Sequence, residues 1–375
     1  MSHQGPTPVS VREHAGADPA PEVVVTTSAR RPGRENRQQL SNFLWKYSVP
    51  ILFLVILIGA SLLRPETFAT YTNITAVLSI QALVLIIALA GMLEMLTGEF
   101  DLSLANNTAL VAALTIGLQV KQDLSWPLAI GLALLASIAV GALNAFLVVV
   151  MKVSSFVATL GTYTLLSGVW IWYLGNQAIV PEEPLPTGFT NLGRHTILGL
   201  TVPFWVAIGL AIVIFAVLKW LPLGRRIHAV GANRRAAELA GVRPRHIVAG
   251  TLVVAALIAG IAGVLLAAQY GGASPGAGSA LIFPAFAGVF LGATTIDPGR
   301  FNVLGTVLAV YTLAFMVAGL QQLGGIWSEA WVTPTFNGLT VIVAVSLSAW
   351  AFSFREKRAG KDSLARLSTE GEDER

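Results

Sequence analysis

The feature that most constrains this chain is a succession of long apolar runs, which begins at residue 47 and continues to residue 352. A helix that crosses a bilayer needs about 20 mostly apolar residues. Lipid offers the backbone no hydrogen bonds, so spanning segments of this kind are helical. Ten runs are candidates: 47–63, 75–97, 104–120, 126–150, 155–174, 201–221, 247–268, 280–293, 301–320 and 333–352. The sequence therefore predicts an all-α, polytopic integral membrane protein with about ten transmembrane helices.

The eighth run differs from the others because it is short and contains Pro284. A glycine-rich stretch, 271–278, precedes it, and Asp297-Pro298-Gly299 follows it. Non-helical backbone at membrane depth is tolerated where protein or water covers it. We therefore expect one short or broken helix at 280–293.

The distribution of positive charge predicts the orientation. With ten spans, 21 of the 24 Lys and Arg residues fall on the side that holds both termini. Positive charge collects on the cytoplasmic side of membrane proteins, so both termini are expected in the cytoplasm. The net charge of +4 then reflects membrane orientation, and no nucleic-acid partner is expected.

The flanks of the apolar region are polar. Residues 1–46 are interpreted as a disordered cytoplasmic tail, residues 47–352 as the transmembrane domain, and residues 353–375 as a cytoplasmic C-terminal tail. Segments of low hydrophobicity cannot bury enough apolar surface to fold alone.

The residues that several kinds of chemistry require are absent from the sequence. The chain has no cysteine, so disulfides, thiolate metal sites and cysteine nucleophiles are excluded. Its one Gly-Lys pair, Gly360-Lys361, is followed by Asp362, so no phosphate-binding P-loop exists. The five histidines do not cluster, and no acid, base and nucleophile converge in sequence. We predict no catalytic residue, no cofactor and no metal ligand, and therefore not an enzyme.

The basic loop 222–246, between the sixth and seventh spans, is the first stretch with a functional signal. Asn233 is a plausible N-cap for a short helix that continues to Ala240. One interpretation is a loop that only fixes orientation. The other is a surface helix that receives force from a soluble partner, which the length and punctuation of the loop favour.

A polar stretch between the second and third spans is the second signal. It carries Glu94, Glu99 and Asp101, and Asn106 and Asn107 continue it into the next span. Carboxylates at membrane depth are costly and usually functional. The residues are either interfacial charges or part of the wall of a hydrated cavity.

Several motifs resemble those of one transporter family. The loop segment 224–242, with its Ala-Val-Gly-Ala-Asn, Ala-Ala and Ala-Gly-Val pieces, is similar to the coupling loop of ribose/xylose-type permeases. Those proteins are the membrane subunits of ATP-binding-cassette (ABC) sugar importers. Thr97-Gly-Glu-Phe-Asp-Leu-Ser103, Gly141-Ala-Leu-Asn144, and segments 155–161 and 288–306 resemble other elements of the family. The resemblance covers about residues 47 to 352.

The resemblance implies a permease subunit in the bacterial inner membrane, which forms the translocation pathway for a monosaccharide or similar small polar solute. Its implied partners are a separate ABC ATPase, an extracytoplasmic solute-binding protein, a second permease copy in a homodimer, and membrane lipid. The residues expected to contact the ATPase are Arg225, Arg226, Gly231, Asn233, Arg234, Arg235, Ala236, Ala237, Glu238 and Gly241. The candidates for the translocation path are Glu94, Asp101, Ser103, Asn106, Asn107 and Asn144.

The alternative function is a secondary transporter or channel for a small polar solute, driven by an ion gradient. The broken eighth span and the carboxylates suit it. Such a transporter does not need a coupling loop, and the form of residues 222–246 therefore favours the ATP-driven importer.

Overall fold

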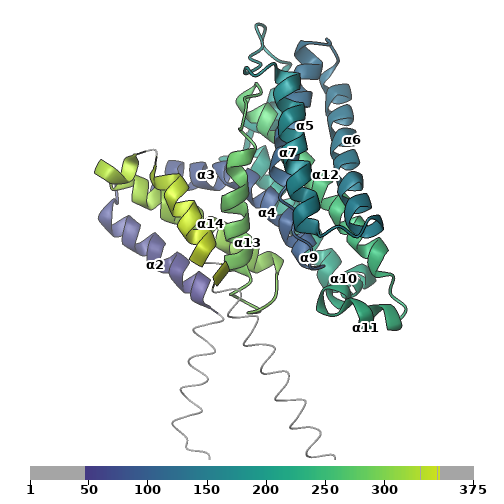
Figure 1. Ribbon diagram of the computed structural model, residues 1–375. Helices are drawn as coiled ribbons and strands as arrows, with labels where there is room; N and C mark the ends of the chain where they lie inside the picture. The colour runs from purple at the N-terminus through teal and green to yellow at the C-terminus, as the bar shows by residue number, and fades with distance from the viewer. Residues whose placement is uncertain (1–46, 330, 344, 347–375) are drawn as a thin grey trace, which may run out of the picture. The chain divides into compact units, whose positions relative to one another are not determined.

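The computed structural model describes residues 47–329, 331–343, 345 and 346. The predicted tails, 1–46 and 353–375, and the last residues of the tenth predicted span lie outside this part of the chain. Within it, one two-stranded hairpin is the only sheet, and helices make up the rest of the regular structure. The predicted all-α polytopic class is confirmed (Figure 1).

The elements follow the apolar runs in chain order. They are α2 (Ser48–Leu63), α3 (Tyr71–Ile80), α4 (Ala82–Met95), α5 (Leu104–Val120), α6 (Trp126–Ala145), η1 (Phe146–Val150), α7 (Ser155–Leu174), α8 (Thr187–Arg194), β1 (Thr196–Ile197), β2 (Leu200–Thr201), α9 (Val202–Trp220), α10 (Pro222–Ala232), α11 (Arg234–Leu239), α12 (Pro244–Tyr270), η2 (Ser279–Leu281), α13 (Ile282–Gly292), α14 (Val303–Gln322) and η3 (Gly325–Ser328). A further apolar helix covers Val332–Val343.

In the described part of the chain, ten apolar helical segments therefore occupy the ten predicted positions. Six are long and apolar enough to cross a membrane, and four are shorter. The predicted short helix is α13, whose 11 residues follow the 3₁₀ turn η2. At 1.5 Å per residue, α13 extends about 17 Å, compared with a hydrocarbon core of about 30 Å. The second predicted span is also interrupted, because α3 and α4 meet at Gln81.

Helix α12 occupies the centre of the bundle and packs against α4, α5 and α6. Of the most apolar 18 consecutive residues of α12, 78% are buried. The corresponding share for the span formed by α3 and α4 is 72%. Small residues permit these contacts: a Cβ on Gly141 of α6 would lie 2.8 Å from the Val253 Cα of α12. Close backbone approach of this kind drives helix association in lipid.

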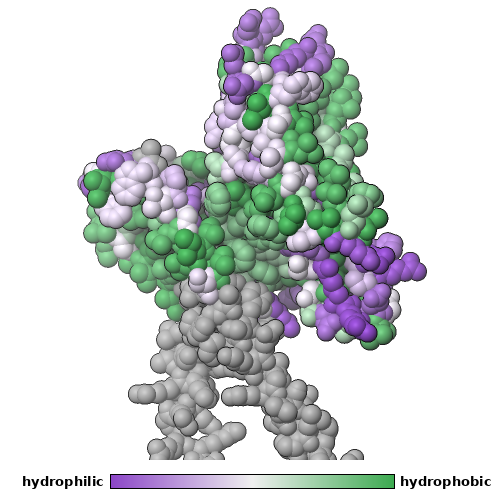
Figure 2. Space-filling model, in the orientation of Figure 1, coloured by the Kyte–Doolittle hydropathy of each residue, from purple (hydrophilic) through white to green (hydrophobic). Residues whose placement is uncertain are grey.

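The peripheral helices expose large apolar side chains. Leu62 on α2, Leu135 on α6 and Ile212 on α9 are each more than half exposed. Figure 2 shows hydrophobic surface over the helices, with hydrophilic residues gathered around α10 and α11 and at the opposite end. This distribution fits a lipid-facing band between two aqueous ends.

The two ends of α12 carry different structures. Its first residue, Pro244, follows the α10–α11 loop. Near its last residue, the Arg194 Nε of α8 donates to the Gln269 carbonyl oxygen at 2.9 Å. The long connection between α7 and α9 is thus folded into α8 and the β1–β2 hairpin and held against the end of α12.

Candidate functional site

The basic loop that the sequence predicts to contact an ATPase consists of α10 and α11, and we refer to it as the docking loop. It is built from two amphipathic helices. In α10, buried residues recur at every third position, at Gly224, Ile227 and Val230. Arg225 and Arg226 lie on its exposed side. A three-residue spacing places side chains on one helical face, so α10 packs inward and presents both arginines to solvent.

Helix α11 has the predicted cap. The Asn233 side-chain oxygen accepts a hydrogen bond from the Ala236 backbone N–H at 3.0 Å, which confirms Asn233 as the N-cap. Gly241 follows the helix with φ +79°, a conformation that favours glycine at a helix end. Of the helix residues, Ala237 is buried, whereas Leu239 is 85% exposed. Ala236, Glu238 and Arg235 are also on the exposed side.

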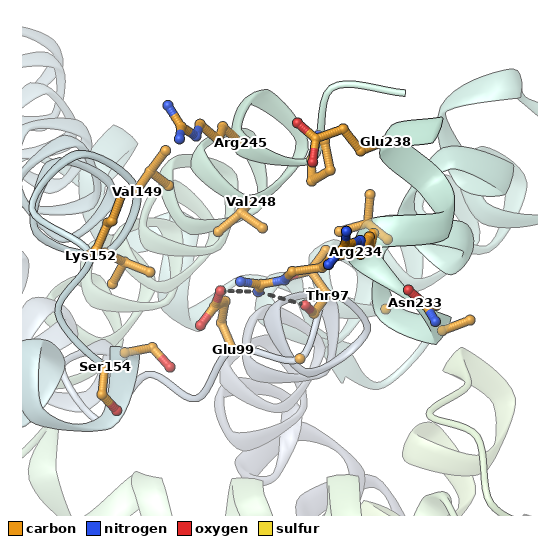
Figure 3. Close-up of a pocket in the computed structure, with 18 of the residues that line it drawn as sticks. Thr97, Glu99, Val149, Lys152, Ser154, Asn233, Arg234, Glu238, Arg245 and Val248 are labelled. Carbon is orange, nitrogen blue, oxygen red and sulfur yellow. Dashed lines mark hydrogen bonds and ion pairs between the residues drawn. The ribbon is translucent and has the colours of Figure 1, made fainter. Parts of the chain in front are cut away.

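The docking loop is joined to the segment between α4 and α5. Arg234 Nη2 donates to the Thr97 carbonyl oxygen at 3.1 Å and forms an ion pair with Glu99 (Figure 3). A Cβ at Gly231 would collide with the Leu96 carbonyl oxygen, so only glycine allows α10 to approach this closely. Glu99 is 6% exposed and Arg234 51% exposed. Arg234 therefore reaches the segment between α4 and α5, although half of its side chain stays exposed.

A cavity of about 1,120 Å³ lies between the docking loop and the adjacent ends of α6, α7 and α12. Its wall carries six charged side chains: Glu99, Lys152, Arg234, Arg235, Glu238 and Arg245. Figure 3 shows Arg234 extending across this space toward Glu99 and Thr97. No local pattern in the sequence predicted that Lys152, in the α6–α7 connection, shares a cavity with the docking loop. The backbone of Lys152 is left-handed, with φ +59°, where the chain turns after the π-helix η1.

Asp101 is the centre of a buried hydrogen-bond network. One of its oxygens accepts from the Ser103 backbone N–H at 2.6 Å, and the other accepts from Asn144 Nδ2 at 3.0 Å. Asn144 also donates to Ser103 Oγ at 2.8 Å and accepts from Thr162 Oγ1 at 2.7 Å. The network connects the 96–103 segment to α6 and α7. Burial raises the pKa of the Asp101 carboxyl, whereas the hydrogen bonds from Ser103 and Asn144 act in the opposite direction.

The two asparagines of α5 connect it to other helices. Asn106 Nδ2 donates to the Tyr163 carbonyl oxygen at 2.7 Å and to Ser167 Oγ at 2.6 Å, both on α7. Asn107 Nδ2 donates at 2.9 Å both to Ser137 Oγ on α6 and to the Ala256 carbonyl oxygen on α12. All six residues predicted from the sequence to line the translocation path are buried. Their role in the path stays a prediction.

Glu94 lies in the last turn of α4 and is completely buried. The carboxyl groups of Asp101 and Glu99 are close enough to interact with it electrostatically. The structure therefore brings together the three acidic residues of the polar stretch, and all three are buried. Among the described residues, no group of three or more His, Cys, Asp or Glu side chains could hold a metal ion.

Comparison with known proteins identifies the family. The family described as "Branched-chain amino acid transport system / permease component" matches residues 73–345. The chain belongs to this permease family. It is a multi-pass membrane protein and a permease component of a transport system. Together with the similarity to the ribose import permeases described next, this match confirms the resemblance found in the sequence.

Individual relatives are import permeases. The ribose import permease of Haemophilus influenzae is 28% identical over 314 residues, which cover 82% of this chain and 94% of the relative. The ribose import permease of Escherichia coli is 31% identical and covers 73% of this chain and 85% of the relative. An autoinducer 2 import system permease of Escherichia coli is 28% identical, over 69% of this chain and 78% of the relative. No solved structure matches the chain.

Proposed function

We propose that this permease is the membrane subunit of an ABC importer for a monosaccharide or similar small polar solute. A separate ATPase subunit hydrolyses ATP, and this chain has no catalytic role. A solute-binding protein delivers the solute on the extracytoplasmic side, and two permease copies form the pathway. The naming of relatives as ribose and autoinducer 2 import permeases supports the solute class.

The observation that carries the coupling role is the construction of the docking loop. Its outer face presents Arg225, Arg226, Arg235 and the exposed Leu239. Its inner face is joined to the 96–103 segment through Arg234 and Gly231. An apolar side chain among basic residues on an ordered helix suits a protein interface. A partner that moves this loop would also move the segment that holds Asp101.

The orientation follows from this proposal, with the docking loop and both termini in the cytoplasm. The chain has no native cysteine, so an introduced cysteine is a clean reporter. Thr187, at the start of α8, and Ala232, at the end of α10, are both exposed. We expect a membrane-impermeant maleimide added to intact cells to label Thr187→Cys and not Ala232→Cys. Permeabilised cells should label both variants, and labelling of Ala232→Cys in intact cells would overturn the orientation.

The energy source separates the importer from an ion-driven transporter. In proteoliposomes that contain this chain alone, we expect no proton or sodium gradient to drive uptake of labelled D-ribose or of other neutral pentoses and hexoses. Addition of the cognate ATPase and ATP on the docking-loop side, and of the loaded binding protein on the other side, should start uptake. An ionophore that collapses ion gradients should then have no effect. Gradient-driven accumulation by the chain alone would instead support the ion-driven alternative, with Glu94, Glu99 and Asp101 as its first candidates.

A further inference from the structure

A second set of cavities lies toward the end of α12 that is remote from the docking loop. The largest has a volume of about 500 Å³ and lies among α3, α4, α12, α13, α14 and the last apolar helix. A cavity of about 310 Å³ shares Gln81 with it, and one of about 440 Å³ shares Tyr270. The largest volume falls within the range of about 300–1,000 Å³ that is usual for small-molecule sites.

Two interrupted helices border the largest cavity. Gln81 separates α3 from α4, and Leu281 ends the 3₁₀ turn η2 that leads into α13. The 14 residues of α4 correspond to about 21 Å at 1.5 Å per residue. Gln81 is therefore about that far from the segment that contacts the docking loop. Interrupted helices at membrane depth are tolerated where they are buried in protein or line a water-filled cavity.

The residues that line these three cavities differ in charge from those that line the cavity beside the docking loop. Among the described residues, none that lines the three cavities is charged, whereas six charged residues line the cavity beside the docking loop. The polar members of the largest cavity are amides and hydroxyls: Gln81, Gln269, Tyr270, Thr333 and Asn337. Amide groups both donate and accept hydrogen bonds, as the hydroxyl groups of a neutral polyol require.

One of these groups has no hydrogen-bond partner inside the described chain. The Gln269 side-chain oxygen is buried and has no hydrogen-bond partner there. Tyr270 is 69% exposed, so one ring face is available to the C–H surface of a sugar ring. An unpaired buried amide oxygen is costly unless a ligand or water satisfies it.

We infer that this charge-free, amide-lined cavity is the solute site in the half of the translocation pathway remote from the docking loop, and that it takes a neutral polyhydroxylated solute. The inference rests on the proposed transport function. It adds which residues would contact the solute, and that the solute is uncharged. Gln81 supplies a hydrogen-bonding amide at the helix break, and Tyr270 supplies the stacking surface. A charged solute would find no counter-ion among the described residues of this wall.

The first test measures whether the cavity is hydrated, and it needs no knowledge of the solute. In proteoliposomes with the assembled transporter, we expect methyl methanethiosulfonate to modify Gln81→Cys and Asn337→Cys at least tenfold faster than Leu135→Cys. Leu135 is an exposed apolar residue of α6, and a thiol in lipid ionises poorly. Equal, slow modification of all three variants would overturn the inference.

The second test measures transport of labelled D-ribose, or of the neutral monosaccharide that the binding protein prefers. Gln81→Leu keeps the side-chain size and removes the amide, and Gln81→Glu keeps the shape and adds a charge. We expect both to lower the maximal uptake rate at least tenfold with KM unchanged, because the binding protein sets KM. ATP hydrolysis stimulated by the loaded binding protein should persist, which distinguishes a solute-site defect from misfolding.

The matched control is Leu135→Gln, which places the same amide on the outer surface of α6 and should leave uptake within twofold of the parent. Parental uptake by both Gln81 variants would refute the cavity as the solute site. That result would leave the ATP requirement, and so the proposed function, intact.

Discussion

Replacement of Asp101 by alanine is expected to abolish most transport, with uptake at least tenfold below the parent. The substitution removes the acceptor for the Ser103 N–H and for Asn144 Nδ2, both of which are buried. A hydrogen bond to a charged group contributes about 1.5–3 kcal/mol, and an unsatisfied buried donor adds a further cost. The 96–103 segment should therefore lose its fixed position against α6 and α7. The measurement is uptake of labelled sugar by the complete complex at equal permease content.

Two variants sharpen the Asp101 prediction. Asp101→Asn retains one acceptor oxygen, so its uptake rate should lie between those of Asp101→Ala and the parent. Glu99→Ala should lower uptake less than Asp101→Ala, because Glu99 pairs with the half-exposed Arg234, whereas Asp101 accepts hydrogen bonds from two buried groups. Heating in detergent followed by size-exclusion chromatography gives the folded fraction of each variant. Parental uptake by Asp101→Ala would show that the network is dispensable.

Reversal of the charge at Arg234 is expected to have the second large effect. Arg234→Glu would place a carboxylate against Glu99 and leave the Thr97 carbonyl without its donor. Like charges in close contact cost several kcal/mol, so α11 should be pushed away from the 96–103 segment. We expect uptake to fall at least tenfold and the ATPase subunit to bind more weakly in co-purification.

The charge swap is the control for this prediction. Arg234→Glu combined with Glu99→Arg restores opposite charges across the same contact and should recover part of the lost uptake. Arg235→Glu tests the exposed neighbour, which makes no such internal pair among the described residues. Arg235→Glu should weaken ATPase binding without disturbing the contact between α11 and the 96–103 segment. The double reversal of Arg234 and Arg235 should show both defects. Normal uptake by Arg234→Glu would remove the basis for a linked docking loop.

The sequence predicted the helices well where the signal was local. The third predicted span, 104–120, coincides with α5, because polar residues bound the apolar run at each end. The short helix of the docking loop was predicted from Asn233 and from the glycines and prolines around it, and the N-cap acts on the backbone three residues ahead. The seventh helix is longer than predicted, since Pro244 is accommodated in its first turn and α12 extends to Tyr270.

The interruption at Gln81 was not predicted. A single glutamine in an apolar run from residue 75 to 97 does not lower the hydropathy enough to mark a break. The contacts around α3 come from distant parts of the chain: the Thr201 N–H donates to Ser79 Oγ, and Tyr71 donates to the Leu198 carbonyl oxygen. These contacts depend on how the α7–α9 connection folds, which no local pattern encodes.

The sequence by itself determined the class of protein, the positions of ten apolar helices, the short helix capped by Asn233 and the family. Hydropathy, capping and motif spacing are local properties, and each can be read from a short window. Only the tertiary structure decided that Arg234 faces Glu99, that Asp101 and Asn144 share a network, and that uncharged amides surround a cavity at the remote end of α12. The first two pairings join residues 135 and 43 positions apart. Such partners are selected by helix packing, because a buried polar group must find its complement wherever the bundle places one.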